Sequence, residues 1–399
     1  MDRGTMSAAG RRIAVCGHHD TRGGTEKAMS RTLSLLSRQG FDIVFVTKAN
    51  VAVMRDLLPD GVTVAYVSAD NMWGRFLGTL LAADERPKWW MRAIRKTLHL
   101  LSGKRHYWAY EYAERHLTGI SEERFDAVLD FEGYGFIETV IGTHLNAPVR
   151  ATWVHDENLK RLALGYPYLV RYDRIFCVSH AVQAAVAQRY PQLADRTRVL
   201  LNPVDADAIR RQARMEAPVL LQEEVPTAFR LVTVCRLVPE KNLELSMQVA
   251  AALRDRGLEF VWEVFGEGPD RGALQNLIDR MNLSGRFVLR GAIDNPYPSM
   301  AQADVYVQTS GHEGFGLAVQ EAKILGVPVV VTDIPAFREQ VVDGQTGFIR
   351  PPDATVLADV IIRLAGHPEE RRRIAENLAA LDWTDAQDES PLFEFLGLE

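Results

Sequence analysis

Two glutamates eight residues apart, Glu313 and Glu321, are the side chains in this sequence with the clearest potential for chemistry. Residues 305–308 form an apolar run that predicts a strand, and the apolar spacing after residues 314–316 is that of a helix. We therefore expect Glu313 in a loop and Glu321 in the second turn of the helix. The Gly-Phe-Gly segment at 314–316 would present free backbone N–H groups at the helix N-terminus, a favourable place for a phosphate.

The chemistry of these groups suits a sugar nucleotide, because carboxylates accept hydrogen bonds from hydroxyl groups and glycines let a ligand come close to the backbone. Two other interpretations fit the spacing of Glu313 and Glu321: a strand-loop-helix junction with two solvated acids, and the acid pair of a glycoside hydrolase. The hydrolase is disfavoured because the backbone around the acids would orient a nucleotide, and because the two cations described next have no role in glycoside hydrolysis.

Arg236 and Lys241 lie between the apolar run at 229–235 and a helix expected to begin near Leu243. A guanidinium and an ammonium at a helix entrance can bind a diphosphate and stabilise it as a leaving group. Two surface charges that merely flank a turn are equally compatible with the local sequence.

The first half of the chain offers weaker signals. Gly24 precedes a helix expected over residues 25–38, so anion binding at its N-terminus is plausible, but the glycines do not fit Gly-x-Gly-x-x-Gly. His155 ends the apolar run at 149–155, where its imidazole could donate a hydrogen bond to a sugar hydroxyl or phosphate near neutral pH; a single histidine is more often structural. We interpret His18, in the loop before Gly24, as a surface histidine.

Alternating apolar strands and amphipathic helices must position these residues, and the alternation predicts two α/β halves joined near a proline-containing crossing. Strands are expected at 13–16, 41–47, 62–67, 125–131, 149–155, 174–179 and 199–205 in the first half, and at 229–235, 260–265, 287–289, 305–308 and 327–331 in the second.

The whole-chain properties limit the function classes. A length of 399 residues suffices for about two domains, and the net charge of −6 gives no basic field that would attract nucleic acid. Cys16, Cys177 and Cys235 lack metal-type spacing and are expected to be reduced core residues of a cytosolic protein. No apolar run is long enough to cross a membrane.

The Asp-x-Asp pattern of Asp205 and Asp207 lies at the crossing between the two halves, and we interpret it as chance rather than as a metal site.

Residues 86–110 combine cations with aromatic side chains and contain no acid. Two interpretations of this stretch remain open: it lies on an anionic membrane surface, or it packs its apolar side on its own domain and leaves a solvated basic face. The residues that would contact a membrane or an acceptor are Trp89, Trp90, Arg92, Arg95 and Lys96.

Together these residues resemble the retaining glycosyltransferases of family four, which have the GT-B architecture. Residues 295–298 further resemble members that build capsule, exopolysaccharide or lipid-linked oligosaccharides. The motifs that come in the family's order lie at 23–24, 202–205, 236–241, 266–269, 313–321, 326–330 and 343–347.

The resemblance implies an α/β protein with two Rossmann-like, doubly wound parallel-sheet domains that face a central cleft. A disordered lead would span residues 1–12, the acceptor-binding domain 13–203 and the nucleotide-sugar-binding domain 204–380. Residues 381–399 would cross back to the first domain.

The resemblance also implies the roles of individual residues at the donor. Arg236 and Lys241 would bind the donor diphosphate, and Glu321 would bind the ribose hydroxyls. Glu313 would act in catalysis by binding the transferred sugar, together with the backbone amides of the segment Gly314, Phe315 and Gly316.

Two residues of the first half would complete the site. His155 matches the histidine that reaches the donor sugar near the reacting carbon, and Gly24 would border the phosphates across the cleft.

The implied activity is metal-independent, configuration-retaining transfer of a hexose from a nucleotide-diphosphate sugar, with UDP as the expected nucleotide. The acceptor would be a glycan or a lipid-linked glycan in bacterial cell-surface polysaccharide synthesis. The resemblance implies no metal and no cofactor. The cysteines and the lack of a spanning run indicate a cytoplasmic enzyme, and it would be peripheral on the inner face of the plasma membrane if residues 86–110 bind a membrane. Two alternatives are a sugar-nucleotide 2-epimerase of the same fold and a non-catalytic glycosyltransferase-like subunit.

Overall fold

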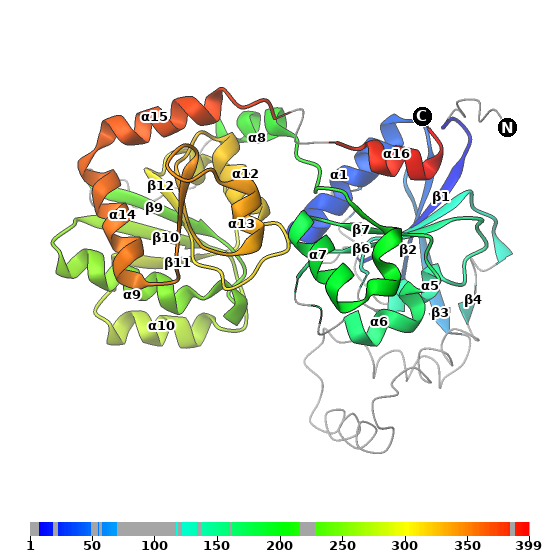
Figure 1. Ribbon diagram of the computed structural model, residues 1–399, viewed down its shortest axis with the longest axis horizontal. Helices are drawn as coiled ribbons and strands as arrows, with labels where there is room; N and C mark the ends of the chain where they lie inside the picture. The colour runs from blue at the N-terminus through cyan, green and yellow to red at the C-terminus, as the bar shows by residue number, and fades with distance from the viewer. Residues whose placement is uncertain are drawn as a thin grey trace, which may run out of the picture. The chain divides into compact units, whose positions relative to one another are not determined.

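The computed structural model describes residues 8–18, 23–48, 55, 58–69, 117–118, 122–133, 137–157, 159, 162–215, 228–383 and 388–398. The chain separates into two compact units, each with helices packed around its own sheet (Figure 1). The first unit comprises Met1–Val178, Val182–Leu200 and Glu389–Glu399, and the second comprises Ser179–Ala181 and Leu201–Asp388. The observed boundary after Leu200 lies close to the predicted one between residues 203 and 204.

The first unit contains an eight-stranded sheet in the order β4-β3-β2-β1-β5-β6-β7-β8. All of its strands are parallel except β4, which runs antiparallel to β3. The order reverses between β1 and β5, the position where doubly wound sheets bind ligands. The strands are β1 (Arg12–Cys16), β2 (Asp42–Lys48), β3 (Thr63–Ala69), β4 (Leu117–Thr118), β5 (Ala127–Asp130), β6 (Arg150–Val154), β7 (Arg174–Cys177) and β8 (Thr197–Val199).

Helices connect these strands, and the last helix of the chain belongs to this unit as well. The ring of Phe395 meets that of Phe176 edge-on, with centroids 6.0 Å apart, and the Arg11 guanidinium donates to the Leu396 carbonyl. The helices are α1 (Gly24–Arg38), α5 (Ile137–Gly142), α6 (Leu162–Leu169), α7 (His180–Arg189) and α16 (Ser390–Leu396).

The second unit contains a six-stranded parallel sheet in the order β11-β10-β9-β12-β13-β14, which reverses between β9 and β12. The strands are β9 (Phe229–Val234), β10 (Phe260–Phe265), β11 (Phe287–Gly291), β12 (Val305–Gln308), β13 (Val329–Thr332) and β14 (Gly347–Arg350). The helices are α8 (Ala206–Ala213), α9 (Leu243–Asp255), α10 (Arg271–Arg280), α11 (Tyr297–Ala301), α12 (Leu317–Ile324), α13 (Pro335–Gln340), α14 (Ala354–Gly366) and α15 (Pro368–Ala379).

The predicted α/β class is confirmed, but the strand expected at 199–205 was misplaced. The strand β8 ends at Val199, and residues 200–205 are irregular up to α8. Pro203 has no N–H to donate to a neighbouring strand, which disfavours continued pairing. The Asp205 carboxylate accepts a hydrogen bond from the Ala208 N–H at 2.7 Å and so caps α8. Helix capping thus accounts for this acid of the Asp-x-Asp pattern.

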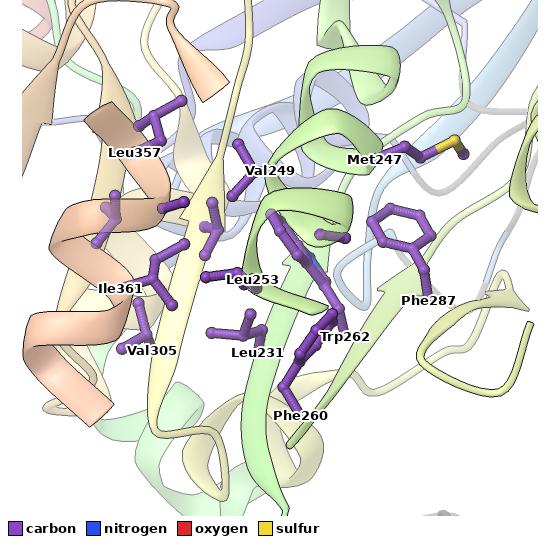
Figure 2. Packing of buried hydrophobic residues seen from close by; sticks show 14 of the residues in the cluster. Leu231, Met247, Val249, Leu253, Phe260, Trp262, Phe287, Val305, Leu357 and Ile361 are labelled. Atoms are coloured by element: carbon purple, nitrogen blue, oxygen red, sulfur yellow. The ribbon is translucent and has the colours of Figure 1, made fainter. Parts of the chain in front are cut away.

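One of the two buried hydrophobic clusters in the described part of the second unit lies where α9 and α14 pack on the sheet, as Figure 2 shows. Val249 and Leu253 of α9 are four residues apart and therefore point to the same side, toward Leu231 and Trp262 of the strands. Trp262 is completely buried and donates its indole N–H to Thr233 Oγ1 at 3.0 Å. This packing holds β9 in place, and β9 leads directly into the loop that carries Arg236.

Replacing Leu253 by alanine should lower the free energy of unfolding of the second unit by about 2–5 kcal/mol, because the fully buried side chain would leave a cavity. Urea denaturation would measure the change. The matched control is Gln248→Ala on the exposed side of the same helix, which should change stability by less than about 0.5 kcal/mol. Equal effects of the two substitutions would contradict the packing described.

Candidate functional site

The loops that follow β9 and β12 leave the second sheet at the point where its strand order reverses. Hydrogen bonds join these loops directly. The Gly311 N–H donates to the Glu240 carbonyl at 2.9 Å, and the Thr309 hydroxyl donates to the Asn242 carbonyl at 3.0 Å. The predicted residues Lys241 and Glu313 are therefore brought together although they lie 72 positions apart in the chain.

Lys241 and Glu313 form an ion pair, with 2.6 Å between Nζ and Oε1. Ser310 Oγ donates to the same carboxylate oxygen at 2.7 Å. Both charged side chains are largely buried, at 18% and 11% exposure, so the pair is shielded from solvent. The sequence predicted both residues as ligands of a donor molecule but gave no sign that they would bind each other.

Arg236 follows β9 and is exposed, and within the described parts of the chain no acid forms an ion pair with it. The charge of Lys241 is already balanced by Glu313. Arg236 is therefore the cation of this loop that stays available to an incoming diphosphate, although Glu240 of the same loop carries the opposite charge.

Two glycines allow the 266–270 loop to pack against the backbone next to Arg236. The Leu237 N–H donates to the Glu267 carbonyl at 2.9 Å, and the Asp270 N–H donates to the Leu237 carbonyl at 3.2 Å. A Cβ atom at Gly268 would lie 2.2 Å from the Leu237 carbonyl oxygen, and one at Gly266 would lie 1.8 Å from that of Cys235. Side chains at these positions would displace the loop that carries Arg236.

Glu321 lies in the second turn of α12, as predicted, and is buried. Its Oε1 accepts a hydrogen bond from the hydroxyl of Tyr297 at 2.8 Å. Tyr297 belongs to the motif at 295–298, which was noted only for its resemblance to other proteins; its contact with Glu321 depends on the packing of α11 and α12 and was not predicted.

The segment between the glutamates is shaped by Gly316, which caps α12 with a φ of 90°. A Cβ atom there would lie 2.6 Å from the ring of Phe337, so glycine is needed for space as well as for conformation. The Gln340 side-chain amide donates a hydrogen bond to the Phe315 carbonyl. Among the described residues, none accepts a hydrogen bond from the backbone N–H groups of 314–316. These N–H groups have the character expected of an anion site.

In the first unit, α1 begins at Gly24 just after the loop that leaves β1. The carboxylate of Glu26 lies close to Gly23, with Oε2 2.4 Å from where a Cβ atom of that glycine would be. This helix N-terminus thus already has a negative group beside it, and the contact of Gly24 with phosphates stays a prediction.

His155 follows β6, and its Nε2 lies 2.6 Å from the carbonyl oxygen of Phe131. A carbonyl only accepts, so Nε2 carries the proton. Burial lowers the pKa of His155 from 6.5 to about 4, more than the hydrogen bond to Phe131 raises it, and the ring is neutral at pH 7. The remaining nitrogen, Nδ1, is then an acceptor. The prediction that His155 donates a hydrogen bond to a ligand needs this revision.

Three buried carboxylates, Asp130, Glu132 and Glu138, lie near the carboxyl end of β5 and were not singled out from the sequence. Burial raises the pKa of Asp130 to about 6 and that of Glu132 well above its usual range. His18 Nδ1 lies 3.1 Å from Glu132 Oε1, so His18 is not the surface histidine that was predicted. The only hint in the sequence was two acids at the end of an apolar run.

The predictions that remain concern contact with a membrane or an acceptor and the absence of a metal site. Trp89, Trp90, Arg92, Arg95 and Lys96 lie outside the described residues. In the part that is described, no helix has the length and apolar character needed to cross a membrane, and no three His, Cys, Asp or Glu side chains gather as metal ligands would.

Parts of the chain are similar in sequence to known glycosyltransferases. Residues 222–380 match the family model for glycosyl transferases group 1. Alpha-D-kanosaminyltransferase of Streptomyces kanamyceticus is 32% identical over 180 residues, which cover 44% of this chain and 46% of that protein. A GDP-mannose-dependent alpha-(1-6)-phosphatidylinositol dimannoside mannosyltransferase of Mycobacterium tuberculosis is 31% identical over 150 residues, covering 37% and 38%. This chain thus spans less than half the length of each of these relatives.

Solved structures resemble the chain over nearly its full length. HepE of Anabaena, in complex with UDP and glucose, has a TM-score of 0.69 at 18% identity and covers 96% of this chain and 99% of its own. A mutant of TarM from S. aureus, in complex with Fondaparinux, alpha-GlcNAc-glycerol and UDP, has a TM-score of 0.67 at 13% identity and covers 96% and 99%. The chain has the GT-B fold of these glycosyltransferases. Residues 222–380 form its glycosyltransferase group 1 domain.

The neutral His155 should make the stability of the first unit depend on pH. Since its pKa is lowered in the folded protein, the unfolded chain binds more protons between about pH 4 and 6.5, and folding loses stability as the pH falls through this window. The loss is at most about 3 kcal/mol. Asp130, with a raised pKa, acts in the opposite direction, so only a comparison with a variant isolates the histidine.

Thermal denaturation of the wild type and of His155→Gln between pH 4.5 and 7.5 would measure this effect. The glutamine amide can still donate to the Phe131 carbonyl but does not titrate. The wild type should lose stability relative to the variant as the pH falls. A constant difference across the range would show that His155 is not held neutral.

Gly268→Ala should destabilise the second unit by about 1–3 kcal/mol, because the Leu237 backbone must move to admit the new methyl group. Gly272→Ala is the matched control, since a Cβ atom there meets nothing within 4 Å. Urea unfolding of both variants would test this, and equal stabilities would contradict the close approach of the two loops.

Proposed function

We propose that the protein is a retaining glycosyltransferase that moves a hexose from a nucleotide-diphosphate sugar, with UDP as the nucleotide, to a glycan or lipid-linked acceptor. One observation carries the proposal. The glycosyltransferase group 1 domain brings Arg236, the Lys241–Glu313 pair and Glu321 to the reversal point of its sheet. Cations that can bind a diphosphate and carboxylates that can bind hydroxyl groups therefore lie at the same edge of the sheet.

The reaction needs stabilisation of a diphosphate leaving group. As the bond between the anomeric carbon and the phosphate oxygen breaks, negative charge grows on the diphosphate and positive charge grows on the sugar ring. Arg236 and the N-terminal end of α12 would stabilise the diphosphate. Lys241 can add two of its three ammonium hydrogens, because Glu313 takes one. With these groups in place we propose that the transfer requires no metal and no cofactor.

Retention of configuration follows if the acceptor hydroxyl attacks from the face that the diphosphate leaves. A phosphate oxygen would then take the proton of the hydroxyl, so no protein base is required. Glu313 is poorly suited to be that base, because its Oε1 already accepts hydrogen bonds from Lys241 and Ser310. We assign the other carboxylate oxygen, Oε2, to a hydroxyl of the donor sugar, and Glu321 to the ribose.

His155 would accept, through Nδ1, a hydrogen bond from a hydroxyl of the donor sugar. Its neutral state favours this role, since an imidazolium would repel the positive charge that develops on the ring. Gly24 would border the phosphates, where a side chain would hinder a close approach.

The relatives support a sugar nucleotide donor without fixing its base. HepE is known with UDP and glucose, and TarM with UDP and alpha-GlcNAc-glycerol, whereas the mycobacterial relative is GDP-mannose-dependent. We propose a role in bacterial cell-surface polysaccharide synthesis and a cytoplasmic location at the inner face of the plasma membrane, with residues 86–110 as the peripheral contact.

A sugar-nucleotide 2-epimerase is the second candidate, and one observation favours it. Inverting a sugar carbon requires groups that remove and return a proton, and buried carboxylates with a raised pKa, such as Asp130 and Glu132, can do this. A non-catalytic subunit is the third candidate, but it would have no need for the ion pair of Lys241 and Glu313.

The proposal predicts that UDP or a UDP-sugar raises the melting temperature of the protein in a screen of UDP-, GDP- and ADP-sugars.

Arg236→Ala should weaken UDP binding about ten- to hundredfold, because a charge-assisted hydrogen bond to the diphosphate is lost. Lys241→Ala and Glu321→Ala should abolish transfer while the protein stays folded; the lysine variant also leaves the Glu313 carboxylate without its cation.

Calorimetry with UDP and circular dichroism would measure binding and folding, and Arg280→Ala, an exposed arginine on α10, is the matched control. Normal turnover of the Lys241 or Glu321 variant would refute the donor site. Incubation with UDP-N-acetylglucosamine alone separates the candidates. An epimerised product would show that the protein is an epimerase and not a transferase, and an absence of nucleotide binding would favour the non-catalytic subunit.

A further inference from the structure

A chain of hydrogen-bonded side chains runs along β12 to Glu313. The hydroxyl of Tyr306 lies 2.8 Å from Gln308 Oε1, Gln308 Nε2 lies 2.9 Å from Ser310 Oγ, and Ser310 Oγ lies 2.7 Å from Glu313 Oε1. Tyr306, Gln308 and Ser310 are buried. Polar side chains in a strand interior are unfavourable unless their groups are satisfied, and here each one is satisfied by the next.

The direction of every hydrogen bond in this chain follows from its last member. An ionised Glu313 can only accept, so the Ser310 hydroxyl must donate to it. Ser310 can then only accept from Gln308, which must present its amide N–H, and Gln308 is left with its carbonyl oxygen facing Tyr306. The tyrosine hydroxyl therefore donates to Gln308.

The other end of the chain starts at the backbone of β9. The Val234 N–H lies 3.3 Å from the oxygen of Tyr306 and donates to it. The Val234 carbonyl oxygen lies 3.2 Å from the same hydroxyl and is a second, more distant acceptor for its hydrogen. The donors of the shorter hydrogen bonds point toward Glu313, and hydrogen bonds aligned in one direction polarise and strengthen one another. Residue 234 is the last of β9, two positions before Arg236, so the chain connects both loops of the candidate site.

The consequence for Glu313 is that its two oxygens are made different. Oε1 accepts from both Lys241 and Ser310, whereas in the described residues no side chain donates to Oε2. Without Ser310, the carboxylate could rotate about its last bond while it keeps the flexible lysine. The serine therefore fixes the orientation of the carboxylate group, and with it the direction in which the second oxygen points.

We propose that Gln308 is a positioning residue for the transfer reaction, acting with Tyr306 and Ser310 to hold Glu313 so that Oε2 is presented to a hydroxyl of the donor sugar. This inference rests on the proposed function and deepens it. Gln308 does not touch the donor, and it acts only by fixing the direction of the Ser310 hydroxyl.

The substitution Gln308→Glu tests the direction of the chain. The introduced carboxyl has the shape of the glutamine side chain, but when ionised it can only accept, so it competes with Glu313 for the single Ser310 hydrogen. When protonated it can donate to Ser310 as the glutamine amide does. Burial and the nearby Glu313 should raise its pKa, so the exchange should occur at accessible pH.

The groups that face position 308 are known. They are Tyr306, Ser310 and the Cys235 thiol, and the charged groups that act on them are Glu313, Glu321, Lys241 and Arg236. Burial raises the pKa of Cys235 to about 12, so the thiol stays neutral over the range of the test.

The experiment measures UDP release from UDP-glucose and UDP-N-acetylglucosamine, and the dissociation constant of UDP, from pH 6 to 8.5. We expect Gln308→Glu to keep the UDP affinity of the wild type within about twofold and to lose about ten- to hundredfold in turnover at pH 8.5. The ratio of its turnover to that of the wild type should rise as the pH falls. Gln275→Glu, the same exchange on the exposed side of α10, should give a ratio of one throughout.

A ratio for Gln308→Glu that does not change with pH would overturn the inference, because loss of packing alone has no such dependence. If this variant does not fold, Tyr306→Phe provides the test, since it removes only the hydroxyl that donates to Gln308: lower turnover at unchanged UDP affinity supports the inference, and unchanged turnover overturns it. A wild type that binds no UDP and releases none would instead overturn the proposed function, and the inference with it.

Discussion

The ion pair between Lys241 and Glu313 is the interaction on which the candidate donor site depends. A buried carboxylate and a buried ammonium are each unfavourable alone, and the two stabilise each other only because β9 and β12 are neighbours in the sheet. The strand order therefore does more than build a core: it brings two distant loops to the same edge. The pair also leaves Arg236 as a cation with which no described acid forms an ion pair.

The glycines and polar side chains around this ion pair have one common effect, because they fix the conformation of the loops that carry Arg236 and Glu313. Gly266 and Gly268 let one loop pack on the backbone of another, and Gly316 starts α12 in a conformation that other residues rarely adopt. Buried hydroxyl and amide groups of β12 complete the hydrogen bonding. A preorganised site of this kind stabilises developing charge without rearranging at the moment of reaction.

The first unit contributes groups of a different character. Burial keeps its histidine neutral, although the hydrogen bond to the Phe131 carbonyl acts in the opposite direction, and burial raises the pKa of its acids Asp130 and Glu132. Neutral groups of this kind suit the recognition of hydroxyl groups and the positioning of a sugar, whereas the charged groups of the second unit suit phosphates. In the proposed function, the first unit would therefore bind the sugar and the second the diphosphate.

The sequence by itself determined the α/β class, most of the strands and the loops that hold Arg236 and Glu313, because apolar periodicity and glycine placement are local properties. It misplaced the strand expected at 199–205, where β8 ends at Val199 and Pro203 has no N–H to donate to a neighbouring strand. Only the tertiary structure decided that Lys241 binds Glu313, that Tyr297 binds Glu321, and that the imidazole of His155 is an acceptor. Each of these contacts depends on which strands and helices become neighbours in space. When such neighbours are far apart in the chain, the local spacing of residue types in the sequence does not reveal the contact.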